Sequence, residues 1–183
     1  MNYSLPLKIK KPFGEELIFH RMEMDQGEEK LIIENFLAPG TQRVKHTFYM
    51  QDEYLIVLHG KLGYQIKDQA PKFIGIGETI FFKRGTPHSL WNAGSDELNC
   101  FGWIKPANNI IFYLSSLYQP KIETKAEESG QFENAYLLYR YRKEFDIQEL
   151  SKFTKSIVLP ATYGIGKITG KYRKFKNAPA PLK

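Results

Sequence analysis

The sequence contains a single cysteine, Cys100, among its 183 residues. One cysteine excludes an intramolecular disulfide, and such scarcity is typical of proteins from reducing compartments. Long hydrophobic runs are also missing. No stretch approaches the roughly 20 apolar residues that span a bilayer, and the first residues lack the apolar core and cleavage pattern of a secretory signal. The sequence therefore predicts a cytoplasmic protein without a membrane span.

Acidic residues are the minority among the charges, with 20 Asp and Glu against 26 Lys and Arg and a formal net charge of +6. A basic balance can indicate nucleic acid or an anionic membrane surface as a partner. The chain has no helix-turn-helix, zinc-finger or aromatic RNA-binding motif. From Gly164 onward it carries six Lys or Arg residues and no acid. We interpret this end as a solvated basic surface and predict no nucleic-acid partner.

Two parts of the chain differ in pattern. Residues 15 to about 104 form short segments rich in Ile, Leu, Phe and Tyr, separated by turn residues, and such spacing is typical of a β-barrel or sandwich. After Pro106 the pattern predicts a helix over 107–118, a polar linker over 119–130 and a helix over 131–146. We therefore divide the chain into a β-barrel with N-terminal strands, residues 1–105, and a helical extension, residues 106–183.

The end of the extension has an amphipathic pattern. The helical spacing of the apolar residues continues from 146 through Ile157, and Pro160 is expected to break or restart the helix. A further amphipathic helix is predicted over 165–175, and the last seven residues are expected to be frayed. The apolar face of that helix would dock on the barrel or on a second subunit, with binding to a membrane surface as the alternative.

Three residues that can bind metal stand at related positions in two hairpin-like stretches, residues 40–60 and 77–92. His46 and Phe48 share one face of an incoming strand, and Glu53 opens the return strand after a short connection. His88 follows a turn at residues 83–85. If the two hairpins lie side by side inside a barrel, His46, Glu53 and His88 converge on one point.

Two other histidines do not fit this group. His59 lies six residues beyond Glu53, which is roughly 20 Å along a strand, so we place it at the rim or in a turn. His20 has no partner at ligand spacing and is assigned to strand packing or to the surface.

These stretches resemble the two sequence motifs of the cupin superfamily. The first motif, G-x5-H-x-H-x4-E-x6-G, is matched by Gly40, His46, Glu53 and Gly60, with Phe48 in place of the second histidine. The second motif, G-x5-P-x-G-x2-H-x3-N, is matched by Gly77, Gly85, His88 and Asn92, with Lys83 in place of the proline. The resemblance covers residues 40–92 directly. It implies a mainly β fold, a cupin-type double-stranded β-helix (jelly-roll) barrel, here with a C-terminal helical extension.

The resemblance also implies a metal site. The family's ligand positions correspond to His46, Phe48, Glu53 and His88, and Phe48 has no donor atom. Two imidazoles and one carboxylate suit divalent iron, manganese, nickel or zinc and leave coordination positions open. A polar cluster without metal, held by hydrogen bonds among the three residues, is the alternative. Because cupin-like domains often pair, a homodimer is also expected.

The barrel interior is expected to form an apolar pocket for a small molecule. Its predicted lining residues are Phe48, Leu55, Val57, Tyr64 and Leu90, together with either Phe101 and Trp103 or Cys100 and Ile104. Arg43, Lys45 and Lys83 are candidates for the mouth of the pocket, although surface charge is the simpler interpretation, and Tyr49 and Tyr54 are candidate hydrogen-bond donors. Cys100 has no local signature of a nucleophile and is interpreted as a core residue.

Three functions fit this sequence. The first is a metal-dependent enzyme acting on a small organic molecule, such as an oxygenase or isomerase, with His46, Glu53 and His88 as ligands. The second is a non-catalytic binder or sensor of a small ligand that uses the same pocket. The third is an interaction protein that works through its basic C-terminal helices. The substitution by Phe48 argues weakly against the first.

Overall fold

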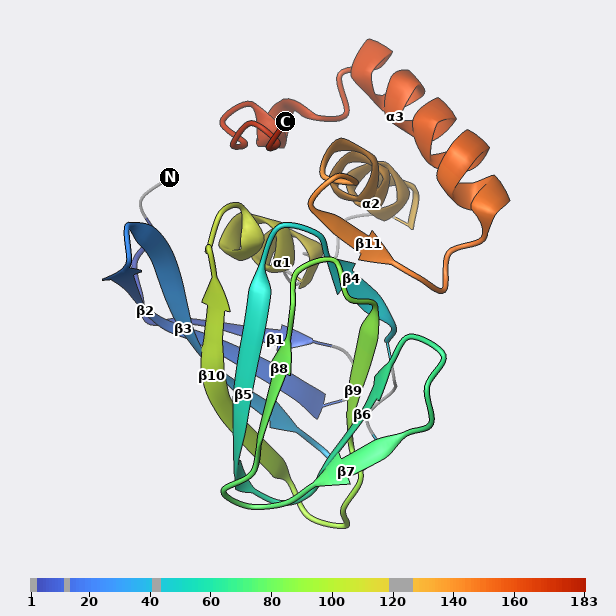
Figure 1. Cartoon of the computed structure of the whole chain (residues 1–183). Coiled ribbons are helices and arrows are strands. Elements are labelled where there is room, and N and C mark those ends of the chain that lie inside the picture. The colour runs from blue at the N-terminus through green and yellow to red at the C-terminus, as the bar shows by residue number, and fades with distance from the viewer. Residues whose placement is uncertain (1–2, 12–13, 41–43, 119–126) are drawn as a thin grey trace.

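The structure is a computed structural model that describes residues 3–11, 14–40, 44–118 and 127–183 (Figure 1). It is a mainly β protein with two antiparallel sheets, as predicted. The six-stranded sheet contains, in spatial order, β1 (Leu7–Lys11), β2 (Glu15–Asp25), β3 (Glu28–Leu37), β10 (Leu98–Lys105), β5 (Asp52–His59) and β8 (Thr79–Phe82). The five-stranded sheet contains β11 (Phe145–Ile147), β4 (His46–Phe48), β9 (His88–Asn92), β6 (Leu62–Ile66) and β7 (Lys72–Ile74).

Strand β10 shows how the residue pattern sets the core. Cys100 and Ile104 are buried, whereas Phe101 and Trp103 are half-buried on the other face. This alternation decides between the two possibilities that the sequence left open, because side chains along a strand point to opposite faces in turn. Between them, Gly102 lies so close to β5 that a Cβ atom would stand 1.9 Å from the carbonyl oxygen of Tyr54. Only glycine fits at this position.

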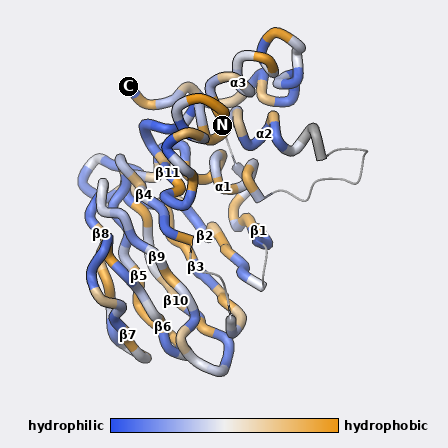
Figure 2. The backbone as a smooth tube through the Cα atoms, turned by 90° about the vertical axis from the view of Figure 1, so that its right-hand side faces the viewer, coloured by the Kyte–Doolittle hydropathy of each residue, from blue (hydrophilic) through white to orange (hydrophobic). Residues whose placement is uncertain are grey.

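The helices gather at one end of the two sheets, as both views show (Figures 1 and 2). They are α1 (Ile110–Tyr118), α2 (Glu127–Arg140) and α3 (Leu159–Ile168), with a π-helical turn at Thr154–Val158 and a 3₁₀ turn at Arg173–Phe175. In the described part of the chain, no helix is long and apolar enough to cross a bilayer. Helix α1 agrees with the prediction for 107–118. Most of the predicted linker, residues 119–126, lies outside the described residues.

The prediction of a helix over 131–146 is wrong at its end. Helix α2 stops at Arg140, and Phe145–Ile147 forms strand β11, which pairs with β4 in the register Phe145↔Phe48 and Ile147↔His46. The physical reason is that β4 would otherwise be an edge strand with unpaired backbone groups, and a short strand satisfies them. The extension therefore supplies one strand of the second sheet.

The helix expected to continue from 146 through Ile157 is absent as one element. It is replaced by β11, a π-helical turn and then α3, in which Pro160 stands at the first turn, so the helix restarts there. The helix predicted over 165–175 is also wrong. Helix α3 ends at Ile168, and Gly170 adopts a φ of +69° that a helix does not contain.

The C-terminal tail is docked rather than frayed. The Tyr141 hydroxyl donates to the carbonyl oxygen of Pro179 at 2.6 Å, and the Asn109 side chain donates to that of Ala180 at 3.0 Å. The backbone N–H of Leu182 donates to Glu144 at 3.0 Å. These are mostly backbone groups, which explains why the side-chain pattern gave no sign of the docking.

Candidate metal centre

The structure brings His46, Glu53 and His88 together. One ligand atom from each residue lies within 4.8 Å of the other two. His46 opens β4 and stands directly opposite His88, the first residue of β9, and Glu53 is the second residue of β5 in the other sheet. Glu53 and His88 are buried, and His46 is half-buried. The group therefore spans the gap between the two sheets.

A tight turn sets the position of His88. The N–H of Gly85 donates to the carbonyl oxygen of Phe48 at 2.7 Å, and the N–H of Thr86 donates to that of Lys83 at 3.0 Å. Gly85 has a φ of +80°, which favours glycine. The turn thus fixes the start of β9 against the end of β4, whose first residue is His46.

Backbone contacts define which nitrogen of each imidazole is available. Nδ1 of His46 lies 3.0 Å from the carbonyl oxygen of Val44, and Nδ1 of His88 lies 2.9 Å from that of Thr86. A carbonyl oxygen only accepts, so each Nδ1 carries the proton. In the neutral rings the lone pair is then on Nε2, the atom that a metal would bind.

The contact between His88 and Glu53 is a test of whether a metal fits. Nε2 of His88 lies 3.0 Å from Oε2 of Glu53. If the imidazole is neutral and the carboxylate ionised, both atoms are acceptors, so a positive centre must lie between them. A proton fills this place in a hydrogen bond, and a divalent metal ion ligated by both atoms would replace that proton. The donor set therefore fits a metal.

The surroundings favour the metal-binding protonation states of the other two groups. Burial, and to a smaller extent repulsion from His88, lowers the pKa of His46 to about 3. The ring is therefore neutral at pH 7. Burial acts to raise the pKa of Glu53, but the hydrogen bond with His88 and electrostatic interactions with His88, His46 and Lys11 hold it below its ordinary value. A neutral imidazole and an ionised carboxylate are the forms that bind metal.

Aromatic rings enclose the group. Phe82 stacks on His88 with ring centroids 3.9 Å apart and an interplanar angle of 6°. Phe48 is buried, and its ring centroid lies 4.9 Å from that of His46 and 6.2 Å from that of His88. Phe48 therefore stands beside the ligands without offering a donor. The two phenyl rings pack against the imidazoles and restrict their orientation.

A cavity of about 110 Å³ lies against the site. His46, Phe48, Glu53 and Leu90 are part of its wall. Its remaining wall is mostly apolar and comes from β1–β3, the segment before β4, β10, α1 and β11. It consists of Lys11, Glu15, Leu17, Ile33, Asn35, Leu37, Val44, Ile104, Tyr113, Leu114, Leu117, Tyr118, Phe145, Asp146 and Ile147. The helical extension thus builds one side of the pocket.

The predicted lining set is only partly placed on this wall. Phe48 and Leu90 line the cavity, whereas Leu55, Val57 and Tyr64 are buried elsewhere in the barrel. Leu55 and Val57 follow Glu53 on the same face of β5, at increasing distance from the site. Tyr64 packs its ring against Phe82, with centroids 6.1 Å apart. These three residues fill the barrel interior instead of lining the cavity.

The candidate polar residues at the mouth are also placed elsewhere. Lys45 forms an ion pair with Asp68 at 3.1 Å, and Lys83 is exposed; neither is among the described residues of the cavity wall. Arg43 lies outside the described residues. Tyr54 stacks on Trp103 on the outer face of the first sheet, with centroids 5.7 Å apart, and Tyr49 is 39% exposed.

The remaining candidate residues have structural surroundings. His59 is exposed at the end of β5, and His20 contacts the Glu34 carboxylate at 2.8 Å. Cys100 is buried, and burial raises the pKa of its thiol to about 12, so it is not a thiolate at neutral pH.

Six polar residues of the cavity wall were missed by sequence reasoning. They are Lys11, Glu15, Asn35, Tyr113, Tyr118 and Asp146. A signal for Asn35 was available, because it interrupts an inward-facing row of Leu31, Ile33 and Leu37 at alternate positions of β3. The other five come from β1, β2, α1 and β11, and nothing local indicates that these elements meet the two motifs.

No family model and no curated protein matches this chain. Several solved structures are similar to it, and two of them are described as a double-stranded β-helix domain and a cupin domain. An uncharacterised conserved protein with a double-stranded β-helix domain from Klebsiella pneumoniae shares 16% identity over 50% of this chain and 78% of its own, with a TM-score of 0.42. The cupin domain of Cnp3 from Schizosaccharomyces pombe shares 14% identity over 56% and 72%, with a TM-score of 0.43.

KdgF from Halomonas sp. shares 13% identity over 55% of this chain and 87% of its own, with a TM-score of 0.46. Matches at this level assign no activity. The fold assignment rests on the two antiparallel sheets, the motif positions and the meeting of the motif residues. On these grounds, the strands of residues 7–105, completed by β11, form a double-stranded β-helix barrel of the cupin type.

Proposed function

We propose that this protein binds one divalent metal ion through His46, Glu53 and His88, and that the ion and the adjacent cavity together bind a small organic molecule. The observation that carries the proposal is the convergence of the three ligand atoms within 4.8 Å. The backbone contacts of both Nδ1 atoms support it, because they leave each Nε2 for a metal.

The residues present suit iron, manganese, nickel or zinc in the divalent state. When bound, such an ion supplies a Lewis acid that polarises an oxygen atom of the ligand. The chain's own contribution is to hold two imidazoles and one carboxylate in fixed orientations and to leave other coordination positions open. Phe48 and Phe82 limit the access of water, and the cavity orients the ligand. This arrangement supports a metal-dependent enzyme of small molecules, such as an oxygenase or isomerase.

A non-catalytic binder or sensor is the second candidate function. Phe48 favours it, because this ring occupies the place of a fourth ligand and contributes no donor atom. The two candidates differ in whether a bound ligand is converted. Recovery of the ligand unchanged after prolonged incubation with metal-loaded protein and air would favour the sensor.

The third candidate, an interaction protein, concerns a different surface. Phe153 is 63% exposed and Ile168 is 88% exposed near the ends of the last helical segment. A second copy of the chain covering these exposed side chains would give the homodimer that we predict. Size-exclusion chromatography with light scattering, on wild-type protein and Ile168→Lys, tests this prediction.

Metal analysis tests the principal proposal. Full-length protein would be dialysed against Mn²⁺, Ni²⁺, Zn²⁺ or anaerobic Fe²⁺, desalted and measured by plasma mass spectrometry. We expect about one equivalent of at least one metal in the wild type and in His59→Ala, which removes an exposed histidine. Glu53→Gln and His88→Ala are expected to lose it. Equal metal content in all four proteins, or none in the wild type, would refute the proposal.

A further inference from the structure

Two residues that line the cavity each have a buried polar side-chain atom without a hydrogen-bond partner. These atoms are the Tyr113 hydroxyl and the Asn35 amide oxygen Oδ1. Tyr113 is 3% exposed and Asn35 is 8% exposed. Leaving a buried donor or acceptor unpaired costs about 1–3 kcal/mol, and native structures keep few such atoms. Their position on one cavity suggests that a ligand satisfies them.

Both side chains are held in place by their surroundings. Asn35 lies in the middle of the first sheet, where β3 aligns it with Leu17 on one side and Cys100 on the other. The Tyr113 ring stacks on Phe145 of β11, with centroids 4.3 Å apart and an interplanar angle of 23°. Fixed polar atoms on a mostly apolar wall are typical of a specific small-molecule site.

The charges around the cavity indicate an anionic ligand. Among the described residues, Glu53 is the only carboxylate of the proposed ligand set. A divalent ion bound there would therefore keep one uncompensated positive charge. Lys11 forms an ion pair with Glu15 on the same wall of the cavity, so these two residues add no net charge. Asp146 is likewise paired with Lys155, at 2.7 Å. Because an uncompensated charge in a low-dielectric site is costly, a monoanion is the favoured occupant.

We propose that the cavity recognises a small hydroxylated carboxylic acid with a short apolar group. This inference deepens the proposed function and rests on it for the charge argument. The ligand carboxylate accepts a hydrogen bond from the Tyr113 hydroxyl and neutralises the metal, and the ligand hydroxyl donates to Oδ1 of Asn35. The apolar group packs on Leu17, Ile33 and Leu114. Burial raises the pKa of Tyr113, which keeps it a hydrogen-bond donor.

The size of the cavity limits the ligand. A cavity needs a volume of roughly 10–15 Å³ to hold one water molecule, so the cavity of about 110 Å³ accommodates roughly seven to eleven groups of that size. A branched five-carbon hydroxy acid meets this limit. The test therefore uses both enantiomers of 2-hydroxy-3-methylbutanoate as the probe. The matched compounds are 3-methylbutanoate, which lacks the hydroxyl, and 2-hydroxy-3-methylbutanamide, which lacks the charge.

The probes would be titrated calorimetrically into full-length protein, both loaded with Mn²⁺ and stripped of metal. We expect one enantiomer of the hydroxy acid to bind at least about tenfold more tightly than either matched compound. Asn35→Leu should abolish the preference for the hydroxyl, and Tyr113→Phe should weaken both acids about tenfold. Ser115→Ala is the matched control, because it removes another buried, unpaired hydroxyl from α1 that is not among the described lining residues.

The outcomes separate this inference from the proposed function. If the protein retains Mn²⁺ but binds all probes equally or none of them, the inference is overturned while the metal site stands. If no metal is retained, the proposed function fails. The titration of the metal-free protein then decides whether Asn35 and Tyr113 bind the ligand. A preference for the hydroxylated acid over 3-methylbutanoate there supports the roles of Asn35 and Tyr113, and its absence overturns them. The wild-type comparison of probes needs no variant to fold.

Discussion

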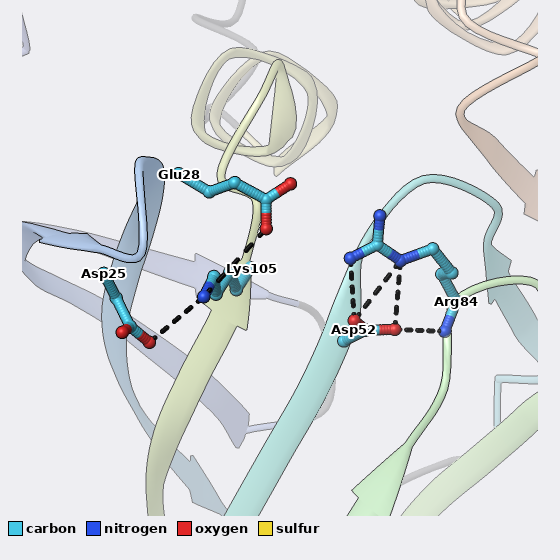
Figure 3. Close-up of polar contacts among 5 residues, drawn as sticks. All are labelled: Asp25, Glu28, Asp52, Arg84 and Lys105. Atoms are coloured by element: carbon cyan, nitrogen blue, oxygen red, sulfur yellow. Dashed lines mark hydrogen bonds and ion pairs between the residues drawn. The ribbon is translucent and has the colours of Figure 1, made fainter.

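Arg84 holds the carboxylate of Asp52 through both its backbone and its side chain (Figure 3). The backbone N–H donates to Oδ1 at 2.7 Å, and Nη2 donates to Oδ2 at 2.8 Å. Asp52 directly precedes Glu53, and Arg84 lies in the turn before His88. This pair therefore ties together the two segments that carry the candidate ligands. Figure 3 also shows Lys105 beside Asp25, with an N–O distance of 3.2 Å.

Asp52→Ala is expected to weaken both the fold and the site. The variant loses the ion pair and an acceptor for the backbone N–H of Arg84, so we expect a loss of about 1 kcal/mol in the free energy of unfolding. Metal affinity should fall severalfold, because the start of β5 is less well fixed. Urea unfolding and metal titration measure the two effects. Asp96→Ala, which removes an exposed carboxylate away from the site, is the control and should leave both unchanged.

Acid is expected to destabilise the metal-free protein through His46. The pKa of this residue is about 3 in the folded state against 6.5 ordinarily. Between these values the unfolded chain binds more protons, so stability present above pH 6.5 is lost as the pH falls toward 3. The lowered pKa of Glu53 acts in the same direction at lower pH.

The measurement is the free energy of unfolding in urea from pH 7 to pH 4.5. His46→Gln should reduce the slope against pH by up to about 1.4 kcal/mol per pH unit. His59→Gln removes an exposed histidine and should keep the wild-type slope. An unchanged slope in His46→Gln would show that the ring is not held neutral by its surroundings.

The candidate ligands could be predicted from the sequence because each stands at a fixed offset from a turn. Gly60 and Gly85 both adopt positive φ values, +81° and +80°, in the turns that close the motif strands. Once the turns are placed, alternation along the strands aligns His46 with His88 across the pair. Strand β11 could not be predicted this way. Its three residues continue a helical spacing, and only the unpaired backbone of β4 selects the extended form.

Gly102→Ala should be among the most damaging single changes in the barrel. The added Cβ would stand 1.9 Å from the carbonyl oxygen of Tyr54, and a backbone atom in a central strand cannot move aside. We expect a loss of more than about 2 kcal/mol, seen as a lower melting temperature. Gly164→Ala is the matched control. It has open space in helix α3 and should raise stability by about 0.5–1 kcal/mol.

Phe48→His is expected to increase metal affinity. The side chain lies beside both imidazoles, so the new ring nitrogen would offer a further ligand. We expect the dissociation constant to fall about tenfold or more, against a loss of about 1 kcal/mol in stability from the edge contact with Phe145. Competition with a metal chelator measures the first effect. Unchanged affinity would mean that position 48 does not reach the ion.

Glu144→Ala should release the C-terminal tail. This carboxylate is fully buried and accepts hydrogen bonds from the Asn109 side chain at 3.0 and 3.1 Å and from the N–H of Leu182 at 3.0 Å. Its removal leaves these donors unpaired, which costs about 2–3 kcal/mol. Faster tryptic cleavage after Lys176 would report the release. Glu97→Ala, an exposed acid, should be cleaved at the wild-type rate.

The position of β11 has a consequence for biosynthesis. The three candidate ligands all precede residue 90, but the cavity beside them is closed by Tyr113 and by a strand that begins at Phe145. A nascent polypeptide therefore exposes the ligands well before their pocket exists. A metal ion that binds the emerging chain would meet the ligands without the surrounding cavity. The cavity would close only after residue 147 has been synthesised.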